Sequence, residues 1–117
     1  MNIYHLKTGE ILASGDTMKE AAEANRDLRY ADLRRADLRK ADLQQVLLQG
    51  ANLRWADLRR ADLRRAILCG ADLCHADLSW ADCTGADLSF ADLRGARLTG
   101  TIFFGTHVTC TEFDPVA

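Results

Sequence analysis

The sequence predicts an all-β solenoid, in which short extended segments and tight turns coil around one shared core. Residues 26–115 divide into eighteen pentads without an insertion, and most pentads carry alanine, then aspartate or asparagine, then leucine in the same order. The pentad ADLRR, for example, occupies 31–35 and returns at 56–60. A period this short, sustained over most of the chain, indicates a single repeat architecture.

The five-residue period excludes the two simplest regular structures. On an α-helix, five residues turn about 500°, which moves each leucine about 140° around the helix axis. On a straight strand, side chains alternate between faces, so an odd step sends successive leucines to opposite sides. Both objections disappear if the backbone turns a corner once per pentad. Every leucine, and every alanine two residues before it, can then face one interior.

The central residue of each pentad is therefore predicted to fill the core. The Asp or Asn before it is predicted to accept hydrogen bonds from nearby backbone N–H groups, as these residues do in turns. The two residues after it are predicted to face solvent. Cys83 takes a central position and is interpreted as a small buried apolar residue. The predicted core positions are Leu33, Leu38, Leu43, Leu48, Leu53, Leu58, Leu63, Leu68, Leu73, Leu78, Cys83, Leu88, Leu93, Leu98, Phe103, Val108 and Phe113.

The A(D/N)LXX pattern resembles that of the pentapeptide-repeat family over these eighteen pentads. The resemblance implies a right-handed quadrilateral β-helix with four pentads per coil, so the repeat segment would form about 4.5 coils. The turn aspartate is missing from VLLQG at 46–50, AILCG at 66–70 and ARLTG at 96–100.

The ends of the chain depart from the repeat. Residues 1–25 are predicted to form a cap, with a hairpin that turns near Lys7–Glu10 and a short helix whose Thr17–Glu20 stretch fits a capping box. A solenoid exposes its core at each end, and such a cap would cover the first coil. Pro115 is expected to stop the strand pattern, and 116–117 is assigned as a tail. The last coil is either a stacking surface for a dimer or a solvent-exposed terminus.

Charge is unevenly distributed, because residues 26–65 carry a net charge of +5 and residues 66–115 a net charge of −5. The basic half is a candidate surface for a polyanion or an acidic partner. The alternative is a solvated surface on which arginines and the neighbouring aspartates neutralise one another. The candidate basic surface consists of Arg34, Arg35, Arg39, Lys40, Arg54, Arg59, Arg60, Arg64 and Arg65.

A second candidate surface is apolar. Stacking at a twenty-residue spacing places Leu47 beside Ile67, at the outward position that most pentads give to Asp. Cys69 lies on the same inferred face, with Tyr30 and Phe90 near its ends. These five residues form a candidate contact patch. The alternatives are a modest apolar surface or a seat for the cap helix.

The sequence contains no recognisable catalytic, metal or cofactor site. His5, His75 and His107 are scattered, and no nucleophile has a base at a recognised spacing. The pair Cys74-His75, with Cys69, lacks a CxxC motif and a fourth ligand for zinc. We therefore expect no enzyme activity, no metal and no cofactor. With no signal peptide and no apolar run long enough to span a membrane, we expect a cytoplasmic protein with free cysteines and no membrane partner.

The predicted function is a non-catalytic rigid scaffold or protein-interaction module whose partner the sequence does not identify. A homodimer through the C-terminal end or the apolar face is one option. The resemblance implies an alternative, since some pentapeptide-repeat proteins bind bacterial DNA gyrase by imitating duplex DNA. The short rod and near-neutral charge of −2 depart from that pattern. A third hypothesis is weak nucleic-acid binding by the Arg-rich half, although the sequence contains no recognised nucleic-acid-binding module.

Overall fold

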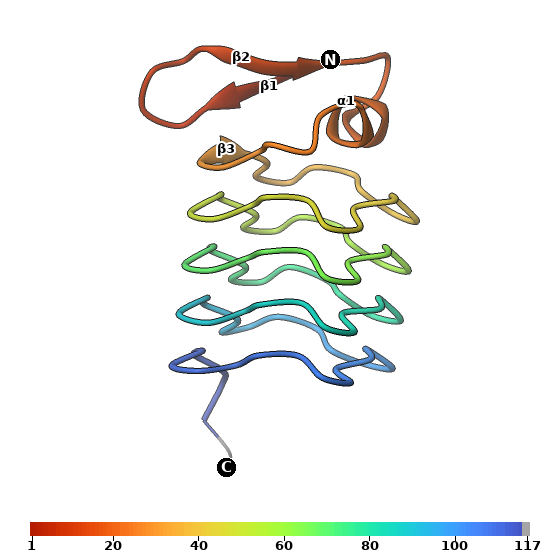
Figure 1. Ribbon diagram of the computed structural model, residues 1–117, viewed down its shortest axis with the longest axis vertical. Coiled ribbons are helices and arrows are strands. Elements are labelled where there is room, and N and C mark those ends of the chain that lie inside the picture. Colours follow the sequence, from red (N-terminus) through yellow and green to blue (C-terminus); the bar gives the residue numbers. More distant parts are fainter. Residues whose placement is uncertain (116–117) are drawn as a thin grey trace.

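The structure, a computed structural model, describes residues 1–115 and consists of a small cap above a stack of flat coils (Figure 1). The cap contains strands β1 (Asn2–His5) and β2 (Ile11–Ser14) and helix α1 (Met18–Ala24). Strand β3 (Ala31–Asp32) belongs to the first coil. Within residues 1–115, no helix combines the length and the hydropathy that a membrane span requires. The predicted tail at 116–117 lies outside the described residues.

Residues twenty positions apart lie side by side in successive coils. Parallel bridges join Asp37 to Asp57, Asp57 to Asp77 and Asp77 to Arg97, and equivalent bridges follow the other three sides of the stack. The backbone N–H of Leu38 donates to the carbonyl of Asp57 at 2.8 Å, and the same bond recurs from pentad to pentad. Four pentads therefore complete one coil, as the family resemblance implies.

Each corner is a β-turn with an unusual backbone residue. The N–H of Ala36 donates to the carbonyl of Leu33 at 3.1 Å, and the second outward residue of the pentad, here Arg35, has φ of 57°. L-residues adopt this left-handed conformation at a cost of about 1–2 kcal/mol. The preceding aspartate supports the turn, because Asp77 Oδ1 accepts from the backbone N–H of Ser79 at 3.0 Å. The predicted turn role of these aspartates is therefore confirmed.

Leucines and alanines form one continuous core along the stack. The central residues from Leu28 to Leu93 are at most 2% exposed, and the alanines that precede them are buried as well. Cys83 is also fully buried, and burial raises the pKa of its thiol to about 12. The thiol is therefore protonated and packs as a small apolar group.

The core ends before the last predicted positions. Leu98 and Phe103 are only half-buried, whereas Val108 is 45% exposed and Phe113 is 41% exposed. The expectation of a buried side chain at Val108 and Phe113 is wrong. Their inner side has no following coil against it within residues 1–115, so they lie at an open end.

The cap continues the stack on its N-terminal side (Figure 1). Strand β1 pairs antiparallel with β2 and with β3, which places the hairpin against the first coil. Helix α1 begins at Met18 because Thr17 Oγ1 accepts from the N–H of Glu20 at 3.0 Å. A Glu23 carboxylate oxygen accepts from the N–H of Asp42 at 2.7 Å, which ties the helix to the coil beneath it.

Candidate interaction surface

Five of the nine predicted basic residues form ion pairs with aspartates. Arg59 donates to Asp57 through two bonds, Nε to Oδ1 at 2.8 Å and Nη2 to Oδ2 at 2.7 Å. Arg34, Arg39 and Arg64 repeat this geometry, and Arg54 Nη1 reaches an aspartate of the following coil at 3.2 Å. These five residues therefore fit the predicted alternative of mutual neutralisation.

The pairing changes the titration of the aspartates. The hydrogen bond from Arg39 is the main cause that lowers the pKa of Asp37 to about 2, against an ordinary value of 3.8. The hydrogen bond from Arg59 likewise lowers the pKa of Asp57. Both carboxylates are thus ionised near neutral pH and held in fixed orientations.

The remaining four basic residues form no ion pair within residues 1–115. All four occupy the left-handed corner position, with φ between 57° and 60°. Each of the four directly follows an arginine that pairs with the aspartate of the same pentad, and its own side chain projects from the corner. These free cations are Arg35, Lys40, Arg60 and Arg65.

One corner carries a stacked column of side chains twenty residues apart. The Arg35 guanidinium carbon lies 5.7 Å from the centre of the Trp55 ring, within the range of a cation–π contact. The Trp55 and His75 rings are stacked, with centroids 4.4 Å apart and an interplanar angle of 12°. Gly95 follows in the next coil, where a Cβ would lie only 2.4 Å from His75 Nδ1. Trp55 is therefore held on both ring faces, and we call Arg35, Trp55 and His75 the Trp55 column.

The next corner along the chain carries a parallel column, formed by Lys40, Arg60 and Trp80. Trp80 lies against Gly100, where a Cβ would be 2.3 Å from Trp80 Cε3. Trp80 is 57% exposed and Trp55 is 52% exposed. The two columns border the side of the stack formed by residues 36–38, 56–58 and 76–78, since each corner leads directly into or out of it. We call this side, with its two bordering columns, the Trp face.

Sequence reasoning did not select Trp55, His75 or Trp80 as site residues, because it grouped side chains by charge and by loss of the turn aspartate. A usable signal was present. The twenty-residue spacing that pairs Leu47 with Ile67 also aligns Arg35 with Trp55 and Trp55 with His75.

The predicted apolar patch is less exposed to solvent in the structure than expected from the sequence. Leu47 and Ile67 are neighbours joined by a parallel bridge, but both are half-buried, as is Cys69. Tyr30 is 47% exposed and contacts the cap, with its ring centroid 5.9 Å from that of His5. Phe90 is 67% exposed at the same corner. The structure therefore brings Leu47 and Ile67 together and leaves their role as a prediction.

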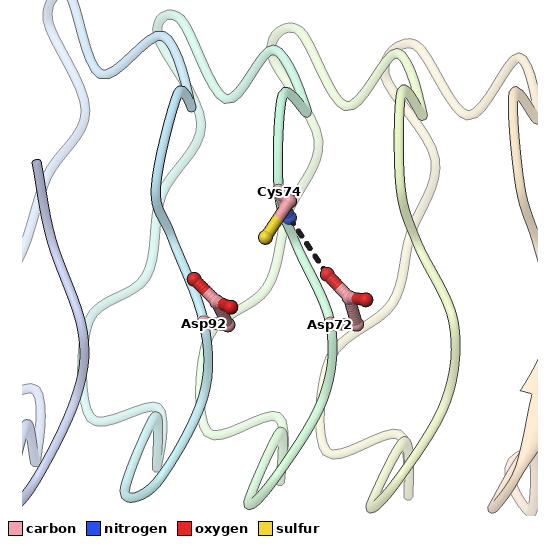
Figure 2. A group of neighbouring side chains, drawn as sticks. All are labelled: Asp72, Cys74 and Asp92. Atoms are coloured by element: carbon pink, nitrogen blue, oxygen red, sulfur yellow. Dashed lines mark hydrogen bonds between the residues drawn. The ribbon is translucent and has the colours of Figure 1, made fainter.

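Cys74 lies between Asp72 and Asp92, on the side of the stack that follows the one with Leu47 and Ile67 (Figure 2). Three potential ligand atoms lie within 4.8 Å of one another, one each from Asp72, Cys74 and Asp92. Burial, together with the two carboxylates, raises the pKa of the Cys74 thiol to about 12, which disfavours the thiolate that binds metal. Arg54 pairs with Asp72 at 3.2 Å and Arg94 with Asp92 at 2.7 Å. The carboxylates already have cationic partners, so the arrangement reads as a structural hydrogen-bond cluster.

Comparison with known proteins identifies the architecture. A family model described as pentapeptide repeats matches eight copies across residues 24–54, 51–82 and 81–114. No curated protein sequence matches the chain. Several solved structures do.

A pentapeptide repeat protein from Nostoc PCC 7120 is 35% identical, with a TM-score of 0.65, over 71% of this chain and 84% of that one. Rfr23 from the cyanobacterium Cyanothece 51142 is 34% identical, with a TM-score of 0.52, over 71% of this chain. The match spans 64% of the length of Rfr23. A thylakoid-lumen pentapeptide repeat protein from Arabidopsis thaliana is 28% identical, with a TM-score of 0.59, over 84% of this chain and 68% of that one. The repeat pattern, the twenty-residue stacking and these matches lead to one conclusion: the chain belongs to the pentapeptide repeat family.

Proposed function

We propose that the protein is a non-catalytic rigid scaffold, a right-handed quadrilateral β-helix whose Trp face binds a protein partner. One observation carries the proposal. Trp55 is more than half exposed, yet it is clamped between Arg35 and His75.

Two physical arguments favour this surface over the other sides of the stack. Tryptophan and arginine are enriched among residues that dominate the binding energy of protein interfaces. A side chain that is already held in place loses less conformational entropy when a partner covers it, so the clamped ring of Trp55 is suited to binding. Trp80 adds a second exposed indole, supported by the close approach of Gly100.

The charges of the Trp face indicate the chemistry of the partner. Arg39 and Arg59 are neutralised by Asp37 and Asp57, whereas the bordering corners carry the free cations Arg35, Lys40 and Arg60. A partner surface with acidic and apolar side chains would complement this pattern. We also propose a cytoplasmic setting, as expected from the sequence.

The two alternatives derived from sequence fit this surface less well. A DNA mimic that binds gyrase needs a predominantly negative surface, and the bordering corners of the Trp face carry cations that have no ion-pair partner among the described residues. Direct binding of nucleic acid would use exposed aromatic ring faces on which bases stack. The ring faces of Trp55 are instead covered by Arg35 and His75.

A homodimer is a second candidate, favoured by the open C-terminal end. Val108 and Phe113 expose about two-fifths of their surface there. The mass of the protein in solution tests this candidate directly. A dimer that becomes a monomer after Phe113→Asp would support it, and a parental protein that is already monomeric would remove it.

Affinity capture from the native cell extract, followed by mass spectrometry, tests the lead proposal. We expect one stoichiometric protein with the parent chain and its loss with Trp55→Ala plus Trp80→Ala. The matched control is Phe90→Ala plus Phe104→Ala, which removes two exposed aromatic side chains outside the Trp face. Equal capture by all three proteins would refute the role of the Trp face, and recovery of topoisomerase subunits would favour the gyrase alternative.

A further inference from the structure

A cavity of about 850 Å³ lies where the cap meets the first coil. It is lined by residues 1, 2 and 16–19 of the cap and by residues 34–37, 39 and 40 of the coil. Figure 1 shows the cap resting on this end of the stack. The volume falls within the range typical of small-molecule sites. We call this space the cap cavity.

The cap cavity carries a strong excess of positive charge. Its lining includes five basic residues, Lys19, Arg34, Arg35, Arg39 and Lys40, against two acidic ones, Asp16 and Asp37. Arg34 and Arg39 are already held by carboxylates, through Nη2–Oδ2 distances of 2.7 Å and 2.8 Å. Lys19, Arg35 and Lys40 form no ion pair with any of residues 1–115. Three cations without an ion-pair partner among residues 1–115 therefore line one space, against the single unpaired carboxylate of Asp16.

The types of side chain indicate which anion fits. A ligand with a single negative charge would leave part of this positive charge uncompensated, whereas a chain of phosphoryl groups offers several charges in a small volume. A lysine ammonium binds phosphate as a point charge, and a guanidinium binds it through a planar fork of donors. Met18 and Ala36 add apolar atoms to the lining. These can contact an uncharged part of a ligand, such as a nucleoside.

The position of Arg35 is supported from below. Its guanidinium lies 5.7 Å from the Trp55 ring centre, and Trp55 is itself stacked on His75. Because this contact restrains the side chain at the edge of the cavity, less entropy is lost when Arg35 binds an anion. Lys40 has no such support, and it faces the cavity from the next corner of the coil.

From these observations we infer that the cap cavity binds a small soluble polyphosphate, either free or as part of a nucleotide. The coil side of the cap cavity belongs to the first coil of the Trp face. The inference still does not rest on the proposed function, since it requires no protein partner.

Calorimetric titration of the full chain with sodium tripolyphosphate, at about physiological ionic strength, tests the inference. We expect saturable binding at one site, and about tenfold weaker binding by Lys40→Asn, because a hydrogen-bonded ion pair is lost. The matched control is Arg60→Asn, which lies one coil further along the same column and outside the cavity. Both positions have φ near 60°, a conformation that asparagine tolerates. The control should bind within about twofold of the parent.

A second variant guards against a folding artefact. Lys19 lies on helix α1, outside the repeat segment, and Lys19→Gln should also weaken binding. Tighter binding of ATP than of tripolyphosphate would point to a nucleotide, and tighter binding of tripolyphosphate to a free polyphosphate; either supports the inference. Absence of saturable binding would overturn it. Equal weakening of tripolyphosphate binding by Lys40→Asn and Arg60→Asn would also overturn it. So would equal weakening, by the same two variants, of binding to a single-stranded oligonucleotide. In either case diffuse electrostatic attraction would explain the binding.

Discussion

Trp80 lies directly against Gly100, the residue twenty positions later in the chain. A Cβ on Gly100 would come within 2.3 Å of the indole ring. The same relationship joins Tyr30 to Gly50 and His75 to Gly95, where a Cβ would lie 2.5 Å and 2.4 Å from the ring above. Glycine in one coil thus provides the space that an aromatic corner residue in the preceding coil occupies.

Replacing Gly100 by alanine should therefore cost more stability than the backbone alone explains. The left-handed φ of 67° contributes about 1–2 kcal/mol, and displacement of Trp80 should add at least about 1 kcal/mol. Gly70→Ala is the matched control, because Gly70 has the same φ and no atom within 4 Å of a Cβ. Chemical denaturation with tryptophan fluorescence measures both variants. Equal losses of stability would show that Trp80 does not rest on Gly100.

Leu58→Ala should reduce the free energy of unfolding by about 2–5 kcal/mol, because Leu58 is fully buried and the substitution opens a cavity in a narrow core. Val108→Ala removes side-chain volume at the same repeat position, but at the open end. It should change stability by no more than about 0.5 kcal/mol. Thermal unfolding followed by circular dichroism provides the comparison, and a mainly helical spectrum of the parent would contradict the coil itself.

Acid should destabilise the protein over a defined pH window. Hydrogen bonds from arginine lower the pKa of Asp37, Asp57 and Asp62 below the unfolded value of 3.8. A lowered pKa in the folded state means that the contribution to stability is complete above the unfolded value. It is lost as the pH falls through 3.8 toward the folded value, which is about 2 for Asp37. Urea unfolding between about pH 6 and pH 2 measures this loss.

The variant Arg39→Gln should flatten part of this pH dependence, because it removes the partner of Asp37. Arg60→Gln should leave the dependence unchanged, since Arg60 has no carboxylate partner within residues 1–115. An identical pH profile for parent and Arg39→Gln would show that these pairs do not stabilise the fold.

The four thiols should differ widely in reactivity. Cys110 is exposed, whereas Cys74 and Cys83 are buried, with pKa values raised to about 12 by burial. Because alkylation requires the thiolate, iodoacetamide should modify Cys110 first and Cys83 only after unfolding. Peptide mapping by mass spectrometry gives the order. Modification of Cys83 as fast as Cys110 in the native protein would contradict a closed core at that position.

The repeat made much of the architecture predictable. An odd period excludes a helix and a straight strand, which leaves a corner in every pentad and an inward central residue such as Leu58. The number of pentads per coil did not follow from that geometry, and came from the family resemblance. Buried side chains at Val108 and Phe113 were expected because each has the inward position, but burial also requires a following coil.

The Trp face was harder to predict, because it depends on stacking between coils. Trp55 and His75 are twenty residues apart and share no local motif. Only the number of residues per coil reveals that they meet. The ion-paired basic residues could not be told from the others in the sequence either, because the repeat pattern predicts that both Arg59 and Arg60 face solvent. The left-handed backbone at Arg60 directs the Arg60 side chain away from Asp57, the aspartate that Arg59 reaches.

Site-specific photo-cross-linking tests most directly whether the Trp face binds a protein partner. A benzophenone amino acid would replace Ser79, next to Trp80, and in a separate protein Ser89, next to Phe90. Both serines are half-buried, occupy the same position in their pentads and precede an exposed aromatic residue, but only Ser79 adjoins the Trp face. We predict a single protein adduct from position 79 in the native cell extract and none from position 89. Adducts from both positions in equal yield, or from position 89 alone, would contradict the assignment of the Trp face as the binding surface.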